Sequence, residues 1–336
     1  MILTFKIKHG MDFSRELALA RKVAEFAIKT RSRSSADVKH IGLKSAIANQ
    51  ILKKYSCNKR AKKVRRVPLT IPNQSIKVDK ERRELSISCL KLNLNYEFRN
   101  DFEKVNQIEI NEDYACVSVS IPEPEQMVVQ GAIGVDRNTT SHCVVIANPQ
   151  TGKVWKLGKS AEHIHKKCSK LRQRFQKAGK YKKLKQVKSR ERNIIKDMNH
   201  KISKKIVEVA KENNCGIRLE ELKGIRNNKK HSRSFRYSLN SWSFYQQQMF
   251  VDYKAKLQGV PTSYDEPAYT SQVCSRCGLL GIRNGKEFKC HSCGHVDHAD
   301  PNAAFNIALG PECMSRLNAD RDAFNGSTDA PREATA

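Results

Sequence analysis

Cys274-Ser-Arg-Cys277-Gly278 and Cys290-His-Ser-Cys293-Gly294 are two C-x2-C pairs with 12 residues between them. Two pairs at this separation can present four thiolates to Zn²⁺ in a tetrahedron, and each glycine lets the backbone fold tightly behind the metal. Asn284-Gly285 lies between the pairs, where a β-hairpin would turn. Because four thiolates fill the coordination shell, such a zinc folds its segment and takes no part in chemistry. The spacing therefore predicts a structural zinc ribbon with the ligands Cys274, Cys277, Cys290 and Cys293.

Around this ribbon, three acids stand where a strand ends or a helix begins. Asp136 follows the apolar run 131–135, and Glu220 follows the run 216–219. Asp300 precedes Pro301, where Asp fits a helix N-cap and Pro fits the first helical position. If the two strands are neighbours and the helix packs across their sheet, the carboxylates converge into a site for two hard divalent cations. Each acid alone is more typical of a turn or a cap, so the spacing leaves convergence open.

Residues 131–264 have an α/β pattern, with short strands and a long helical stretch over 159–213 that breaks near Ala178-Gly179. Between Lys159 and Lys205 there are 18 Lys or Arg against 3 acids, which is typical of a surface that binds a polyanion. Strands are expected at 131–136, 142–147, 153–157, 216–220 and 260–264, and a helix over Ser241–Leu257. The expected order is then the ribbon over 265–299, a last helix of the core over 300–310, and a disordered tail over 311–336.

The N-terminal region, residues 1–130, has a different texture. Its first half predicts helices between about 12 and 55, namely Asp12–Thr30 and Ala36–Tyr55. Short alternating runs over 67–121 predict an antiparallel sheet or a barrel. Pro122-Glu123-Pro124-Glu125 is typical of a linker and marks the first domain boundary.

Composition points to a nucleic acid as the partner. The 336 residues carry 63 Lys and Arg against 34 Asp and Glu, a formal net charge of +29. Clustered cations bind phosphates by releasing condensed counterions. We find no apolar run of membrane-spanning length, no secretory signal and no basic amphipathic helix, so we expect an intracellular protein without a membrane partner. An odd number of cysteines, 11, argues against a disulfide framework.

Several motifs resemble those of the TnpB family of transposon-encoded nucleases. Gly134-Val135-Asp136 and Leu219-Glu220-Glu221-Leu222-Lys223-Gly224-Ile225 resemble its first two motifs. The run Tyr269–Gly278 and the segment Cys290–Ile307, with Asp300-Pro-Asn302-Ala-Ala, resemble its later ones. The resemblance is close over about 131–309 and extends to the N-terminal region only in the order of helices and strands.

The resemblance implies an α/β fold with an RNase H-like (RuvC-like) nuclease core, an inserted zinc ribbon and an N-terminal wedge and recognition region. It implies a metal-dependent DNA endonuclease that uses a guide RNA to find its target DNA. By position, the family's catalytic acids fall on Asp136, Glu220 and Asp300, which would hold catalytic Mg²⁺ beside the structural Zn²⁺. The expected location is the prokaryotic cytoplasm. The oligomeric state, the guide RNA and the DNA motif are not implied.

Two alternatives share these motifs. A non-cleaving RNA-guided DNA-binding repressor would be marked by loss of an acid, and none of the three is lost. A transposase with the RNase H fold would need an end-binding helix-turn-helix domain, which is not visible in residues 1–130.

Glu220 and Glu221 are adjacent, and because side chains alternate along a strand, only one can face the metals. The motif favours Glu220. The resemblance also implies that the basic runs Lys53–Arg66, 159–205 and Lys223–Arg236 line a channel for an RNA–DNA heteroduplex.

Overall fold

The computed structural model describes residues 1–336 except 59–60, 140, 223–242, 266–269 and 311–336. The basic run Lys223–Arg236 and the predicted tail therefore lie outside the described residues. The chain forms two compact units, Met1–Glu123 and Pro124–Ala336, each with its own apolar core. In the described residues, no helix combines the length and the apolarity that crossing a membrane requires.

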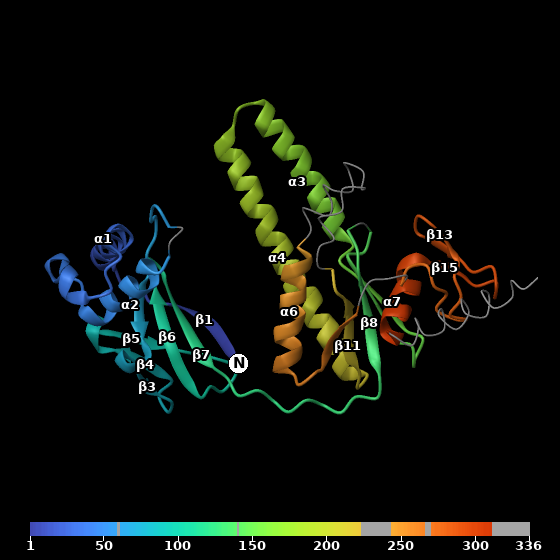
Figure 1. The fold of residues 1–336 in the computed structure, drawn as a ribbon, viewed down its shortest axis with the longest axis horizontal. Helices are drawn as coiled ribbons and strands as arrows, with labels where there is room; N and C mark the ends of the chain where they lie inside the picture. The colour runs from blue at the N-terminus through green and yellow to red at the C-terminus, as the bar shows by residue number, and fades with distance from the viewer. Residues whose placement is uncertain (59–60, 140, 223–242, 266–269, 311–336) are drawn as a thin grey trace, which may run out of the picture. The chain divides into compact units, whose positions relative to one another are not determined.

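The first unit packs two helices with two open antiparallel sheets (Figure 1). The helices are α1 (Ser14–Thr30) and α2 (Ser45–Ser56). One sheet has the order β1-β7-β6-β2, formed by Ile2–Lys8, Tyr114–Ser120, Lys104–Ile110 and Leu69–Pro72. The other has the order β3-β4-β5, formed by Lys77–Asp79, Glu84–Ile87 and Leu92–Asn95. Over the residues that the structure describes, these sheets do not close into a barrel.

The prediction of one continuous helix over Ala36–Tyr55 is wrong. Residues Ser35–Ile41 form a 3-10 helix, and α2 begins only at Ser45. Gly42 ends the 3-10 helix with φ at 83°, in the left-handed region that a helix cannot contain. The apolar periodicity continued across the break because both segments bury residues in the same core, among them Val38 and Ile47.

The second unit is built on a five-stranded mixed sheet with the order β10-β9-β8-β11-β12. The central strand β8 (Ala132–Arg137) pairs antiparallel with β9 (Val144–Ala147), which pairs antiparallel with β10 (Val154–Leu157). On its other side, β8 pairs parallel with β11 (Gly216–Glu220), and β11 pairs parallel with β12 (Thr262–Asp265). The parallel pairing places the carboxyl ends of β8 and β11 at one edge of the sheet.

Helices cover both faces of this sheet. On one face, α4 (Tyr181–Glu212) and α6 (Phe244–Leu257) bury the apolar core that includes Ile133, Val135 and Leu219. On the other face, α7 (Ala299–Leu309) packs against β8 and β9. The approach of α7 requires a glycine in β8, because a Cβ atom at Gly134 would lie 1.9 Å from the carbonyl oxygen of Ala304.

The basic stretch forms a helical hairpin in which α3 (Ser160–Lys177) packs against α4 (Figure 1). Most of its lysines and arginines are exposed. The hairpin is joined internally by Glu191 of α4, whose carboxylate is bonded to Nδ1 of His165 at 2.8 Å and paired with Arg172, both on α3.

The cysteine-rich segment forms a small antiparallel sheet just before α7. Its strands are β13 (Ile282–Asn284), β14 (Glu287–Lys289) and β15 (Val296–His298). Gly285 and Lys286 make the turn between β13 and β14, and Phe288 fills the small core behind the cysteines. Because β15 leads directly into α7, this sheet lies beside the helix that carries Asp300.

Candidate metal centres

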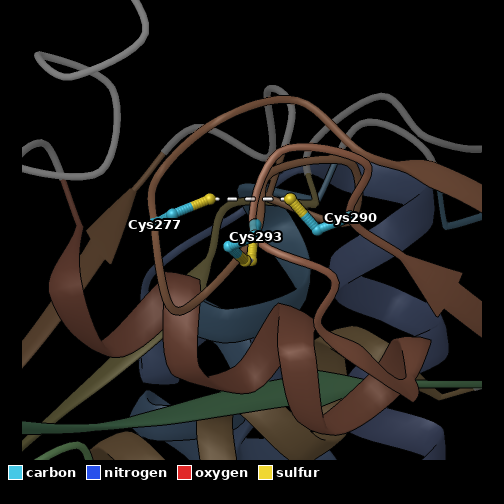
Figure 2. Close-up of side chains that lie close together, drawn as sticks. Cys277, Cys290 and Cys293 are labelled. Carbon is cyan, nitrogen blue, oxygen red and sulfur yellow. Dashed lines mark hydrogen bonds between the residues drawn. The ribbon is translucent and has the colours of Figure 1, made fainter.

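The four cysteines of the C-x2-C pairs come together in one cluster. All four sulfur atoms lie within 4.8 Å of one another. Sγ of Cys274 is 3.7 Å from Sγ of Cys293, and Sγ of Cys277 is 3.5 Å from Sγ of Cys290. Figure 2 shows the side chains of Cys277, Cys290 and Cys293 turned toward one another. A tetrahedron with Zn–S bonds of about 2.3 Å has sulfur atoms about 3.8 Å apart, so the cluster could hold a zinc ion.

The thiols of the cluster differ in how readily they ionise, because burial raises the pKa of Cys274 and of Cys277. Burial opposes ionisation of Cys290, but the backbone N–H groups of Ser292 and Cys293 and the neighbouring thiols hold its pKa down to about 7. A thiolate is the form that binds zinc, so one ligand is already close to its binding state at neutral pH. The chemistry of the donor set therefore fits the predicted structural zinc.

A second centre forms where the three acids meet on the α7 face of the large sheet. Side chains alternate along a strand, so Asp136 shares this face with Gly134, while Ile133 and Val135 face the opposite core. In β11, Arg218 faces α7, since its Nη1 donates to the carbonyl of Ala308 at 2.9 Å. Glu220, two residues on, lies on the same face.

Asp136 interacts electrostatically with both of the other acids. Burial first, and then the carboxylates of Glu220 and Asp300, raise the pKa of Asp136 to about 7. Asn138 and Lys286 act in the opposite direction, because an amide N–H and an ammonium stabilise the ionised form. Asp136 and Asp300 are only 8% and 2% exposed, so like charges meet here with little water to screen them.

Lys286 supplies a positive charge inside this centre. Its Nζ lies 2.7 Å from both Oδ1 and Oδ2 of Asp300 and 3.3 Å from Oδ1 of Asn138. Nδ2 of Asn138 in turn donates to Oδ2 of Asp136 at 2.6 Å. One ammonium therefore connects two of the three acids, directly and through an amide.

This arrangement fits a divalent cation centre. Three carboxylates from separate elements carry more negative charge than the ammonium balances, and oxygen ligands suit Mg²⁺. The ammonium marks the position between the two oxygens of Asp300 that a cation prefers. In the described part of the chain, metal-ligand atoms that all lie within 4.8 Å of one another are found at the four cysteines; the three carboxylates are spread more widely.

Glu220 is fixed by groups on both sides of the sheet. Its Oε1 accepts a hydrogen bond from Oγ1 of Thr270 at 2.5 Å. Its backbone carbonyl accepts one from the guanidinium of Arg137, which is 6% exposed and points to the other face of β8. The neighbouring residue Glu221 donates its backbone N–H to the carbonyl of Asp265 at 2.8 Å. The side chain that approaches Asp136 is thus that of Glu220.

The predicted helix cap at Asp300 is wrong. Helix α7 begins at Ala299, and its N-cap is His298, whose Nδ1 accepts from the backbone N–H of Asp300 at 3.3 Å. The Asp300 carboxylate does not cap the helix. It pairs with Lys286 and lies in the carboxylate centre.

Sequence reasoning also missed Lys286, Asn138 and Thr270 as members of this centre. Lys286 stands in a hairpin turn, where a lysine is ordinary, and Asn138 follows the end of a strand, where an asparagine is ordinary as well. Lys286 and Asp300 are separated by the whole of β14 and β15, so no local pattern pairs them. No signal in the sequence identifies Lys286, because a hairpin turn does not indicate which distant carboxylate its side chain will meet.

Comparisons with known proteins agree with these motifs. The family model for the TNB domain of Cas12f1-like proteins matches residues 244–307, which include the four cysteines and Asp300. A TnpB-like protein of Methanocaldococcus jannaschii is 31% identical over 222 residues, covering 63% of this chain and 80% of that protein. The CRISPR-associated endodeoxyribonuclease Cas12f1 of Sulfoacidibacillus thermotolerans is 38% identical over 130 residues, 38% of this chain, but the match spans 29% of that protein.

A solved structure supports the fold over most of the chain. The cryo-EM structure of a Cas12f1–sgRNA–target DNA complex superposes with a TM-score of 0.60, covering 88% of this chain and 82% of that chain. The sequence identity is 16%, so this likeness shows a shared mixed α/β fold and no more.

Proposed function

This chain belongs to the TnpB family, and on that premise we propose that it is an RNA-guided endonuclease that cuts DNA by hydrolysing phosphodiester bonds. The observation that carries the proposal is the convergence of Asp136, Glu220 and Asp300 from β8, β11 and α7 at one buried site. Such a carboxylate cluster is what two hard divalent ions need to bind a scissile phosphate and activate a water.

The large sheet would be an RNase H-like (RuvC-like) nuclease core. In its favour, the order β10-β9-β8-β11-β12 has three antiparallel strands followed by parallel ones, and the acids stand at the carboxyl end of the parallel pair. We propose the domain assignment that goes with it: a wedge and recognition region over 1–130, the core over 131–264, the zinc ribbon over 265–299 and the last core helix over 300–310.

In this proposal the three carboxylates would hold Mg²⁺, which would supply Lewis acidity and a nucleophile at neutral pH. The chain's own residues do the positioning. Thr270 fixes the rotamer of Glu220, Arg137 holds the end of β11, and Asn138 orients the carboxylate of Asp136. Burial of Asp136 and Asp300 leaves little water to screen them, so a bound cation would interact strongly with their ionised carboxylates.

Guide RNA and target DNA are the proposed partners. The exposed lysines of the α3–α4 hairpin offer a surface that would follow phosphate backbones irrespective of base sequence. In this scheme, sequence is read by base pairing with the guide RNA, so the protein needs few base contacts.

The test is cleavage by the purified protein with the RNA that copurifies with it. That RNA is sequenced, and DNA matching its guide segment is offered with a randomised flank and Mg²⁺. We expect cuts in a subset of flanks, with the cut ends recovered by sequencing. Binding to matched DNA without any cut across the whole library would favour the non-cleaving repressor instead.

A further inference from the structure

Lys286 reaches the carboxylate centre from an element that carries none of the acids. It lies at the turn of the β13–β14 hairpin, beside Gly285, whose φ is 59°. Its backbone carbonyl accepts the N–H of Ala299, the first residue of α7, at 2.8 Å. The residue is therefore anchored to the cysteine ribbon and to the start of α7, and its side chain extends from there to Asp300.

The contact with Asp300 is of the kind that a metal ion makes. The ammonium is shared between both carboxylate oxygens at 2.7 Å each, and Asp300 is 2% exposed. A carboxylate this deeply buried is costly without a cation, so removing its partner leaves an uncompensated charge. The bond to Asn138 extends the same charge to Asp136.

We propose that Lys286 is a built-in counter-ion of the carboxylate centre: it holds Asp300 and Asp136 in place without divalent metal and is displaced when metal binds. This rests on the proposed function, since it concerns the same centre. Lys286 is then a positioning residue that lies in the ribbon, so the arrangement of the acids depends on the fold of the ribbon.

Displacement follows from the chemistry of the two cations. The two Asp300 oxygens that hold the ammonium are the ones a divalent ion would need, so both cannot be held fully at once. The lysine side chain is 33% exposed and has a flexible four-carbon stem, so it can move out to water. A divalent ion has twice the charge of the ammonium, so it would bind the Asp300 oxygens in place of the ammonium.

The experiment measures Mn²⁺ binding to the zinc-loaded full chain freed of nucleic acid, by calorimetric titration, in wild type and Lys286→Met. If the ammonium occupies the site nine-tenths of the time, its removal tightens Mn²⁺ binding about tenfold. Lys289→Met, at an exposed lysine of the same hairpin, is the matched control and should change the affinity less than about twofold. Asp300→Asn should abolish the binding, which identifies the site.

Melting temperatures give a second readout that does not depend on catalysis. Without Mn²⁺, Lys286→Met should melt several degrees below wild type, and saturating Mn²⁺ should remove that difference. Zinc content is checked by elemental analysis in each sample. A difference that persists with Mn²⁺, or an unchanged Mn²⁺ affinity in Lys286→Met, would overturn the counter-ion proposal alone. Failure of the wild type and all variants to bind Mn²⁺ would overturn the proposed function as well.

Discussion

The cysteine cluster and the carboxylate centre both gather anionic side chains, but the chain assembles them differently. The cysteines come from one segment, 274–293, and the geometry of two tight turns brings their sulfur atoms within 4.8 Å. The acids come from positions 136, 220 and 300, and they meet only because β8 and β11 pair and α7 crosses their sheet. The first centre is thus a local structure, and the second depends on the fold of the whole unit.

The two centres also differ in how their charge is balanced. Burial raises the pKa of Cys274 and of Cys277, so these thiols stay protonated until a metal displaces their protons, and the cluster carries little charge of its own. The carboxylates lie close together with little exposure to water. Burial and the neighbouring charges raise the pKa of Asp136, and the ammonium of Lys286 pairs with Asp300. Lys286, which lies in the hairpin of the ribbon, connects the ribbon to Asp300.

The largest expected effect breaks the local centre. Cys290→Ser leaves three thiolates, so the ribbon should lose its zinc and with it several kcal/mol of local stability, since structural zinc contributes on the order of 10 kcal/mol in small domains. Elemental analysis should find much less than one zinc per chain. Cys57→Ser, at an exposed cysteine of the first unit, should keep full zinc. Full zinc occupancy in Cys290→Ser would show that these cysteines do not form a structural zinc site.

The next effect concerns the register of β11. Glu220→Gln should lower the DNA cleavage rate by about 10³-fold, or about 4 kcal/mol in activation free energy, because a ligand charge is lost at the centre. Glu221→Gln, the adjacent acid, should keep the rate within about threefold, since alternation turns it away from Asp136. Single-turnover rates measure both. Equal losses would mean that the centre is not organised by this strand.

The local centre could be predicted from the sequence more fully than the centre that depends on the whole fold. The zinc ligands were predicted from spacing alone, because all four lie in one segment and the motif specifies the geometry. For the acids, spacing gave three candidates and left their convergence open, because strand pairing is a long-range property. The resemblance to TnpB supplied what spacing could not, and the relatives confirm that membership.

Where the sequence failed, a competing interaction decided the outcome. Asp300 has the local pattern of a cap, but the helix begins one residue earlier at Ala299, so His298 is the cap and the Asp300 carboxylate pairs with Lys286. The break at Gly42 was hidden by apolar residues that continue the helical period on both sides. Lys286 itself could not be found, because nothing in a hairpin turn indicates which distant carboxylate it will meet.

A smaller effect tests the electrostatics of the acids. Burial first, and then Glu220 and Asp300, raise the pKa of Asp136 to about 7 in the folded protein, from 3.8 for a free side chain. The folded state therefore holds this proton more tightly, and its free energy of unfolding falls as the pH rises between about 4 and about 7. Asp136→Asn is neutral throughout.

The measurement is a series of melting curves without divalent metal from about pH 5 to about pH 8. The melting temperature of Asp136→Asn relative to wild type should rise with pH by a few degrees, since about 1 kcal/mol corresponds to about 2–4 °C in a domain of this size. A difference that stays flat, or falls, would show that Asp136 is not held among like charges.

The smallest effect is on binding and involves neither centre. Charge reversal at Lys182, Lys185 and Lys188 on the exposed face of α4 should weaken binding of the copurified RNA and flatten its salt dependence. Each lost phosphate contact should lower the slope of log affinity against log salt by about 0.7 to 0.9. An unchanged slope would show that this face of the hairpin does not contact the RNA, and it would leave both metal centres unaffected.

The most direct test of the central claim is DNA cleavage by Asp136→Ala beside wild type, each with the same RNA and matched target. Replacing this acid removes the cost of burying a carboxylate and its repulsion from Glu220 and Asp300. The variant should therefore fold, retain its zinc and bind DNA within a fewfold of wild type. We expect cleavage to fall by at least about 10³-fold while binding is retained, because the carboxylate would hold the metal and base pairing would supply the affinity. Cleavage at the wild-type rate by a zinc-loaded, DNA-binding Asp136→Ala protein would contradict it.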